Sequence, residues 1–385
     1  MGYDRVAIFC FYDSKGQISP DVFYLLNELK KNIDLLIVAV NGQIENKALL
    51  SDIADDILIR DNSGFDAGAY RRVLFDKKYA SIIKESKELV LCNSSFFGPL
   101  IPLSNIFETM SESTADFWGI SSFVADLMAH IQSFFLVFRQ RILRGEAFFR
   151  YFFEHIQEDS QDYFGVCASF ENGLYECLVD AGYVPDAFVK NISCDNYTNP
   201  YGSLAADALP VIKKKIFSQQ YFMEAKALDT LNYALDNYKY DIRVLLQSVK
   251  QIYKLPIALE KVKAHVRGEI SVEGFLPLRK KKKKDIKQFI RDNSTIYIYG
   301  AGVEGKGIYM TFFSYEHHPK LKGFIVSDDQ EIREKTLCGY PIYRNRDIMH
   351  KSAGAVIVGL GKENSRMVKD TLCEWKNVIY KWDVD

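Results

Sequence analysis

Short apolar runs of four to six residues alternate with amphipathic segments over the first 210 residues. The apolar runs predict strands at residues 6–11, 35–40, 57–60, 89–92 and 117–120. Runs that are apolar at almost every position are typical of strands covered on both faces, and hence of a mostly parallel sheet. Between the first two runs, Ser19-Pro20 precedes an amphipathic segment that ends in lysines, which predicts a helix. This alternation indicates an open α/β sheet.

The periodicity changes after residue 215. Residues 216–254 have apolar side chains at helical spacing without Gly or Pro, which predicts two helices, and Leu255-Pro256 precedes a third, short one. An α/β pattern restarts at Thr295 with three further apolar runs. We therefore predict an α/β domain over 1–215, a helical segment with a basic linker over 216–290, and a small Rossmann-like domain over 291–385.

Composition narrows the class of protein. The 385 residues are 48% hydrophobic and 26% charged, which excludes a disordered chain, a collagen and a coiled coil. No apolar stretch approaches the ~20 residues of a membrane span, and the N-terminus lacks the features of a secretory signal. The seven cysteines include no C-x-x-C pair, which favours free thiols in a reducing compartment and no zinc site. We expect a cytoplasmic protein.

The net charge of −1 conceals an uneven distribution. Residues 1–210 carry 17 Lys and Arg against 29 Asp and Glu, whereas residues 211–290 carry 18 against 8. A basic surface can bind phosphates or anionic lipid, or can be a solvated helix face that contacts the acidic part. The six consecutive cations at 279–284 predict either attachment to the inner membrane surface or a solvated linker. Nucleic acid is not an expected partner because no base-reading fold surrounds the run.

The loop after the third predicted strand carries candidate chemistry. Asn62 and Asp66 can accept hydrogen bonds from a sugar or a base, and Gly64 and Gly68 allow close approach of a ligand. The loop leads into a predicted helix, whose N-terminal amides favour an anion. Ligands of open α/β sheets bind beyond the carboxyl ends of the strands, where this loop lies. As a pattern by itself, an Asn/Asp/Gly-rich loop is also typical of an ordinary turn.

Several spaced motifs together are more specific than this loop. They are N-S-G-x-D-x-G-x-Y at 62–70, N-S-x-F-G-P at 93–99 with one extra residue, F-W-G at 117–119, H-I-Q-S-F-F-L at 130–136, E-N-G-L…G-Y at 171–183, and L-P-V-I-K at 209–213. With these motifs, residues of about 5–220 resemble the rhamnan synthesis F family of bacterial glycosyltransferases, which assemble rhamnose-containing surface polysaccharides.

The resemblance implies a GT-A-like nucleotide-diphospho-sugar transferase that inverts the transferred sugar. Its donor would be a dTDP-rhamnose-like nucleotide sugar, and its acceptor a growing cell-surface polysaccharide or a lipid-linked glycan. Such transfer needs a base for the acceptor hydroxyl and charge stabilisation for the leaving diphosphate. Asp66 and Glu171 are the implied catalytic residues. Glu171 resembles the family's base, and it also suits an ordinary carboxylate near a helix N-terminus.

The resemblance also implies binding residues for both substrates. The donor-binding set is Asp13, Asn62, Gly64, Gly68, Arg71, Asn93, Ser94 and Lys213. The acceptor-binding set is His130, Gln132 and Trp118. His130 has a structural alternative, a hydrogen-bonded position before a buried strand. The aromatic run at 134–153, which surrounds four arginines, suits either an acceptor groove or core packing, and core packing is the better interpretation for most of its rings.

One departure from related enzymes concerns a metal. Many GT-A enzymes hold Mg²⁺ or Mn²⁺ with an Asp-x-Asp pair at the position that here is Asn93-Ser94-Ser95, which has no carboxylate. Either a metal is held elsewhere, or the cations of Lys213, Lys214 and Arg71 replace it. We assign no metal ligand, and metal dependence stays open.

The C-terminal part carries a separate nucleotide signal. Gly300-x-Gly302-x-x-Gly305 follows an apolar run and opens a predicted helix, and Asp328 ends the next strand. This context matches the dinucleotide fingerprint and predicts nucleotide or nucleotide-sugar binding, or a structural remnant. Hydride transfer with NAD(P) is not expected, because no second half remains to present a nicotinamide. Two alternative functions stay open: a protein that acts through this C-terminal domain, with NAD(P) or by binding a nucleotide sugar, and a non-catalytic scaffold of polysaccharide assembly.

Overall fold

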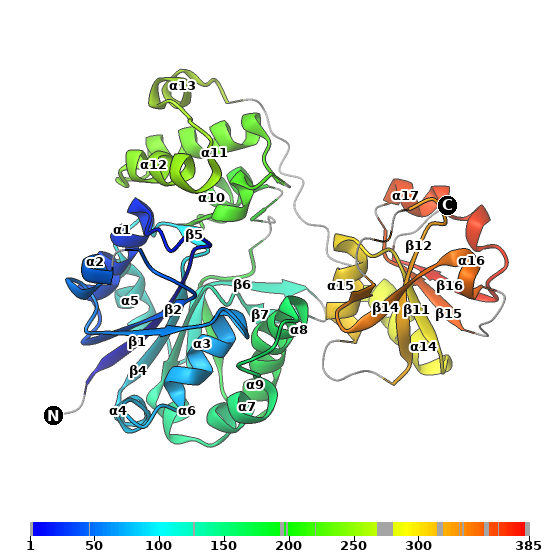
Figure 1. Ribbon diagram of the computed structural model, residues 1–385, viewed down its shortest axis with the longest axis horizontal. Coiled ribbons are helices and arrows are strands. Elements are labelled where there is room, and N and C mark those ends of the chain that lie inside the picture. The colour runs from blue at the N-terminus through cyan, green and yellow to red at the C-terminus, as the bar shows by residue number, and fades with distance from the viewer. Residues whose placement is uncertain are drawn as a thin grey trace. The chain divides into compact units, whose positions relative to one another are not determined.

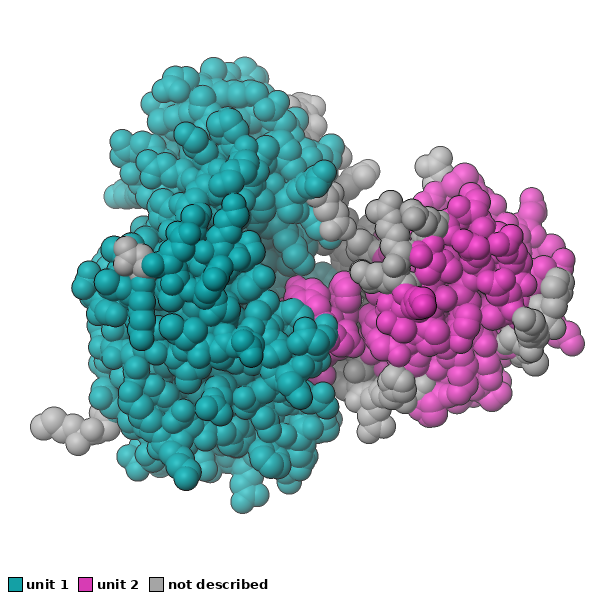
Figure 2. Space-filling view, in the orientation of Figure 1, with its two compact units in different colours: residues 1–124, 130–161, 174–275 teal, residues 125–129, 162–173, 276–385 magenta. Residues whose placement is uncertain are grey.

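The computed structural model describes residues 3–45, 47–125, 128–192, 196–197, 199–219, 221–267, 280–313, 319–330, 332, 335–349, 354–360 and 362–381. The chain forms two compact units (Figures 1 and 2). The first comprises residues 1–124, 130–161 and 174–275, and the second comprises residues 125–129, 162–173 and 276–385.

The first unit is built on one large sheet. Its strands are β1 (Arg5–Tyr12), β2 (Leu35–Asn41), β3 (Asp56–Arg60), β4 (Glu88–Asn93), β6 (Phe117–Ala125), β7 (Met128–Ile131), β8 (Phe135–Arg139) and β9 (Pro185–Val189). The order is β3-β2-β1-β4-β8-β6-β7, with β9 paired to β6. Strands β1 to β4 pair in parallel, and β8 runs antiparallel to β4 and β6. The predicted open, mostly parallel α/β sheet is confirmed.

Helices cover both faces of this sheet. One face packs on α1 (Pro20–Lys30) and α5 (Leu103–Ser111), with Ala7, Phe9 and Phe11 of β1 in their core. The other face lies under α3 (Phe65–Leu74), α4 (Ala80–Glu85), α6 (Gln140–Arg144) and α7 (Ala147–His155). Successive side chains of a strand point to opposite faces, so a strand between two helical layers must be apolar throughout. Helix α2 (Lys47–Ser51) follows β2.

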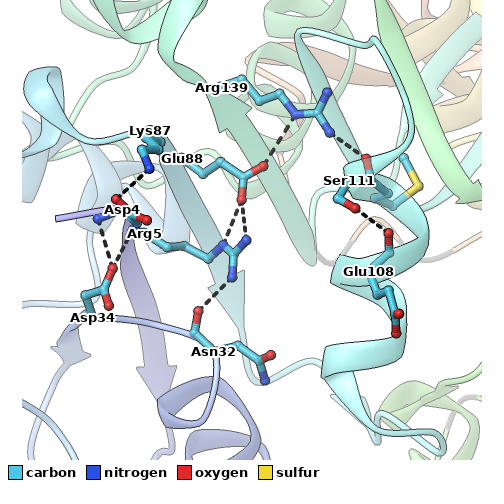
Figure 3. Close-up of polar contacts among 10 residues, drawn as sticks. Asp4, Arg5, Asn32, Asp34, Lys87, Glu88, Glu108, Ser111 and Arg139 are labelled. Carbon is cyan, nitrogen blue, oxygen red and sulfur yellow. Dashed lines mark hydrogen bonds and ion pairs between the residues drawn. The ribbon is translucent and has the colours of Figure 1, made fainter.

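Charged side chains close the edge of the sheet where β1 and β4 begin (Figure 3). The Glu88 carboxylate accepts a hydrogen bond from Arg5 Nε at 2.7 Å and lies 3.4 Å from Arg139 Nε. Arg5 also donates to the carbonyl oxygen of Asn32, and Arg139 to that of Ala115, both at 2.8 Å. This network joins three strands to neighbouring loops, so it has a structural role.

Helix α9 (Leu174–Asp180) packs against α7. A second apolar core is formed by α10 (Pro200–Ala205), α11 (Glu224–Asn237), α12 (Ile242–Tyr253) and α13 (Leu259–Ala264). Helices α10 to α13 pack with the short antiparallel strands β5 (Phe96–Phe97) and β10 (Ile212–Lys213) and with the 3₁₀ turn η2 (Lys214–Phe217). The two predicted helices and the short third one after residue 256 correspond to α11, α12 and α13.

The second unit contains another parallel sheet, β13-β14-β12-β11-β15-β16, in which β13 is antiparallel. The strands are β11 (Ile296–Tyr299), β12 (Leu321–Val326), β13 (Thr336–Leu337), β14 (Tyr340–Arg344), β15 (Ala355–Val358) and β16 (Asn377–Tyr380). The helical elements are α8 (Tyr163–Cys167), the π-helical turn η1 (Ala168–Gly173), α14 (Lys280–Asp292), α15 (Val303–Phe312), α16 (Asn345–Ile348), α17 (Lys362–Met367) and η3 (Asp370–Leu372).

The sequence led to two predictions about membranes, one on spanning helices and one on the cations at 279–284. None of the described helices combines the length and the apolar character that a membrane span requires. Of the cations at 279–284, Arg279 and the side chains of the five lysines lie outside what the structure describes. Their proposed attachment to a membrane therefore stays a prediction.

Candidate functional site

Four side chains form a continuous polar row at the carboxyl edge of the first unit's sheet. Asn93, at the end of β4, donates a hydrogen bond from Nδ2 to Asp66 Oδ2 at 2.7 Å. Its Oδ1 accepts a hydrogen bond from the backbone N–H of Ser95 at 3.1 Å. Ser95 Oγ lies 3.3 Å from Lys213 Nζ. The polar row (Asp66, Asn93, Ser95 and Lys213) thus has a carboxylate at one end and an ammonium at the other.

Lys213 is held in place by its surroundings. Its strand β10 pairs antiparallel with β5, which places Lys213 opposite Phe96. Only 6% of Lys213 is exposed, and its Nζ lies 4.1 Å from the centre of the Phe134 ring. An aromatic face attracts a cation, and burial limits the rotamers of the side chain. Lys213 therefore presents a positive charge at a defined place beside the end of β4.

The Asp66 carboxylate lies at the start of α3, above buried thiol and phenol groups. Burial raises the pKa of the Cys10 thiol and of the Tyr70 hydroxyl, and the negative charge of Asp66 raises both further. Burial also raises the pKa of the Cys92 thiol, and the nearby charge of Lys213 opposes that rise. The three groups are thus neutral, and the charges near them are those of Asp66, Lys213 and Arg60.

Arg60 and Asn41 support the loop that carries Asp66, and sequence reasoning missed both. Arg60, at the end of β3, donates hydrogen bonds to Asn41 Oδ1 at 2.9 Å and to the carbonyl oxygens of Ser63 and Glu158 at 2.7 and 2.8 Å. Asn41 Nδ2 donates to the carbonyl oxygen of Phe65 at 2.8 Å. The available signal was a polar side chain at the end of an otherwise apolar strand.

The backbone of residues 157–158 packs so closely on Gly64 that no side chain fits there. Gly64 has a φ of 65°, and a Cβ there would come within 2.6 Å of the carbonyl oxygen of Gln157. Its N–H donates to the carbonyl oxygen of Ser160 at 2.7 Å. Gly68 is buried on α3, where a Cβ would lie 3.2 Å from the Ser63 carbonyl oxygen. Both glycines therefore have a packing role in the loop, and their contact with a donor stays a prediction.

The other predicted donor residues occupy different positions. Asn62 and Ser94 are half-buried in the same two loops as Asp66 and Asn93. Asp13 Oδ1 accepts hydrogen bonds from the N–H groups of Lys15 and Gln17 at 2.9 and 3.0 Å, which closes the turn after β1.

The structure keeps Arg71 and Lys214 away from the polar row. Arg71 follows Asp66 by five residues, about 140° further around the helix, and bonds to Glu158 Oε1 at 2.9 Å. Lys214 pairs at 2.5 Å with Asp21, a carboxylate that is only 1% exposed. Both cations are occupied by structural partners, so the idea that they take the place of a metal is not supported. Lys213 alone of the three lies in the row.

The predicted acceptor residues lie on and beside β6 and β7. Trp118 is completely buried, with ring centroids 5.5 Å from Phe107 and 6.1 Å from Phe135. A side chain without exposed surface cannot contact an acceptor, so Trp118 is a core residue here. Gln132 Oε1 accepts hydrogen bonds from Ser121 Oγ at 2.7 Å and from Asn196 Nδ2 at 2.8 Å. His130 is half-buried.

Glu171 belongs to the second unit, so the geometry of the polar row does not include it. It lies half-buried in the π-helical turn η1. Such turns are rare, and they occur frequently at functional sites.

The glycines of the second unit differ in what surrounds them. Gly300 has a φ of 112°, and a Cβ at Gly305 would lie 1.8 Å from the Gly300 carbonyl oxygen. A Cβ at Gly302 would meet nothing within 4 Å. Asp328 Oδ1 accepts a hydrogen bond from the N–H of Arg346 at 2.9 Å, in the first turn of α16.

Within the parts of the chain that the structure describes, no three His, Cys, Asp or Glu side chains are grouped as a metal site requires.

Comparisons with known proteins identify the family of the chain. The sequence matches the family of rhamnan synthesis protein F over residues 36–283, more than half of the chain. Comparison with curated proteins finds no match.

Three solved structures are similar to the chain at low identity. The glycosyltransferase GlyE of Streptococcus pneumoniae TIGR4 has 9% identity and a TM-score of 0.32, and the match covers 99% of this chain and 96% of that one. A putative nucleotide-diphospho-sugar transferase from Desulfovibrio desulfuricans G20 has 13% identity and a TM-score of 0.30, with 54% of this chain and 90% of that one covered. A 4-diphosphocytidyl-2C-methyl-D-erythritol synthase has 12% identity and a TM-score of 0.33, with 51% of this chain and 91% of that one covered.

Proposed function

The chain belongs to the rhamnan synthesis protein F family, and we propose that it is a glycosyltransferase of polysaccharide assembly. It moves a sugar, with inversion, from a dTDP-rhamnose-like donor to a growing cell-surface polysaccharide or a lipid-linked glycan, in the cytoplasm. The observation that carries this proposal is the polar row at the carboxyl edge of the sheet, the edge where open α/β sheets bind their ligands.

The two ends of the polar row suit different parts of a nucleotide sugar. A leaving diphosphate gains negative charge during transfer, and a lysine ammonium in a fixed position stabilises it. Phosphate oxygens therefore belong near Lys213 and Ser95. The Asp66 carboxylate would repel phosphates and accepts hydrogen bonds from hydroxyl groups, so it suits a sugar or ribose hydroxyl. Asn62 and Asp13 complete the proposed donor pocket.

The chemistry requires one further group. In an inverting transfer the acceptor oxygen attacks the anomeric carbon while a base removes its proton, and the nucleoside diphosphate leaves with the electron pair of the broken C–O bond. We propose Glu171 as the base, on the family resemblance and on its position in a π-helical turn. His130 and Gln132 are the proposed acceptor contacts.

Substitution of Lys213 tests this assignment. Lys213→Gln removes the ammonium and keeps a polar side chain, and we expect transfer to fall by about 10²–10³-fold. Lys215→Gln is the matched control, because it removes a neighbouring charge that lies outside the polar row. Thermal unfolding of the wild-type protein with a panel of nucleotide sugars identifies the donor, since a ligand of the folded state raises the melting temperature. Absence of stabilisation and of transfer with every nucleotide sugar would contradict the proposal and favour a scaffold.

Gly302 favours a second candidate function, nucleotide binding by the second unit. Gly300 and Gly305 are needed by local packing, whereas Gly302 is exposed and has open space around it. A glycine that packing does not require is consistent with close approach of a ligand. The ligand would be a nucleotide or nucleotide sugar, with Asp328 near its ribose.

A further inference from the structure

A groove of about 630 Å³ lies on the first unit, at the edge of the sheet opposite the polar row. It lies among the end of α3 and helices α4, α6 and α7, which are neighbours at the lower end of the unit in Figure 1. The side chains that define this aromatic groove are three phenylalanines and three cations: Phe75, Phe149, Phe153, Lys84, Arg144 and Arg150.

Two of the three phenylalanines, Phe75 and Phe153, are more exposed than the fold requires, whereas Phe149 is buried. Helix α7 buries Phe148 and Phe152 completely, so these two rings anchor it to the sheet. Phe153 is 64% exposed and Phe75 is 40% exposed, with their ring centroids 5.8 Å apart. Core packing explains the first pair and does not explain the second. Neighbouring exposed aromatic rings on a folded unit indicate an interaction surface.

The cations around the rings are available to a ligand. Lys84, Arg144 and Arg150 are exposed, and none of them forms an ion pair with a carboxylate of the described residues. Glu146 is the one acidic side chain in the lining. The groove is therefore locally positive, although the first 210 residues as a whole carry an excess of acidic side chains.

We propose that the aromatic groove binds the surface of an anionic lipid bilayer. Phe75 and Phe153 enter the boundary between headgroups and acyl chains, and the three cations contact lipid phosphates. Each cation near an anionic leaflet strengthens binding by about fivefold, within a Debye length of about 10 Å. A ring that projects as far as Phe153 suits insertion among lipids better than closure onto an acidic protein segment, the other occupant that the charge would allow.

This binding does not depend on sugar transfer, but combined with the proposed function it has a consequence. Strand β4 has six residues between the two edges of the sheet, which separates them by about 20 Å at about 3.3 Å per residue. A bilayer at the aromatic groove would thus leave the polar row at least that far from the lipid. The acceptor would be a glycan already several sugars long.

Sedimentation of the full-length protein with vesicles tests the proposal. The probes are vesicles of pure phosphatidylcholine and of equal parts phosphatidylcholine and phosphatidylglycerol. We expect binding to the anionic vesicles alone, reversed by high salt. The double variant Arg144→Gln with Arg150→Gln should bind about 30-fold more weakly, and Phe153→Ala should also bind more weakly. Lys239→Gln with Lys250→Gln, which removes the same charge from another exposed region, should bind like the wild type.

Three results would overturn the proposal. The first is no binding to anionic vesicles. The second is equal binding by the groove variants and the control, including the case in which only replacement of the lysines at 280–284 abolishes binding. The third is groove-dependent binding of an acidic peptide without vesicle binding. Transfer to a soluble acceptor is measured in parallel. A wild-type protein that transfers sugar but does not bind anionic vesicles rejects the groove and leaves the proposed function in place.

Discussion

Replacement of Asn93 by aspartate places a second carboxylate against Asp66. The wild-type amide donates to the Asp66 carboxylate at 2.7 Å, and a hydrogen bond to a charged acceptor contributes about 1.5–3 kcal/mol. Because both side chains are partly exposed, the lower part of that range applies. Two carboxylates about 4 Å apart repel each other by about 1 kcal/mol in water and by about 4 kcal/mol at an effective dielectric constant of 20.

This repulsion makes the effect of Asn93→Asp dependent on pH. A neighbouring negative charge raises the pKa of a carboxyl group, so the new pair holds a proton in the folded state at pH values where the unfolded chain has lost it. When folding raises the pKa of a carboxyl group, the protonated group contributes to stability. That contribution is complete below the pKa of the unfolded chain, about 4, and is lost as the pH rises through the pKa of the folded state. We therefore expect about 2–3 kcal/mol of destabilisation near neutral pH and less at pH 5.

Thermal unfolding at pH 5 and pH 8 measures this difference. Asn93→Ala is the matched control, because it removes the amide without adding charge and should cost about the same at both pH values. Donor binding should follow the same order, with the aspartate variant weakest at pH 8. If the aspartate and alanine variants have the same melting temperature at both pH values, residue 93 does not face the Asp66 carboxylate, and the polar row is wrong.

Three further predictions concern other parts of the molecule. Glu88→Ala should destabilise the first unit by about 2 kcal/mol, because it leaves Arg5 and Arg139 without their shared carboxylate; chemical denaturation measures this, and equal stability would contradict it. Glu171→Gln should lower the transfer rate by about 10²–10⁴-fold with donor affinity nearly unchanged, whereas loss of donor affinity would assign Glu171 to the donor pocket. Gly302→Ala should leave the melting temperature unchanged, because a Cβ there meets nothing, but should abolish any stabilisation by a nucleotide bound to the second unit; unchanged stabilisation would remove Gly302 from that site.

The sequence was sufficient for the sheet because burial on both faces leaves a strong signal. The predicted strands became β1 to β4 and β6. Strands β1, β2 and β4 are buried at nearly every position, whereas β3, at the edge of the sheet, is only half-buried. The same property explains the error at Trp118. In a strand that is buried on both faces, the sequence does not show whether a side chain faces a ligand or a helix.

The polar row was only partly predictable, for reasons of distance and direction. Asn93 ends β4 and Asp66 lies just beyond the loop that follows β3, and the rule that ligands bind at the carboxyl ends of strands identified them. The direction of Arg71 around α3 was not predictable, because it is fixed by Glu158, 87 residues away. The bond between Arg60 and the Glu158 carbonyl oxygen spans 98 residues. Contacts over such separations leave no local pattern in the chain.

The two edges of the sheet differ in how their charges are balanced, and this separates stability from function. At the amino edge, Glu88 lies between Arg5 and Arg139 and forms ion pairs with both (Figure 3). At the carboxyl edge, Asp66 and Lys213 are linked through two neutral residues, Asn93 and Ser95. A direct ion pair would neutralise both charges, whereas this spacing keeps an acceptor and a cation facing separate parts of one ligand. Substitutions at Glu88 should therefore change the free energy of unfolding without changing donor selectivity, and substitutions in the polar row should change donor binding most.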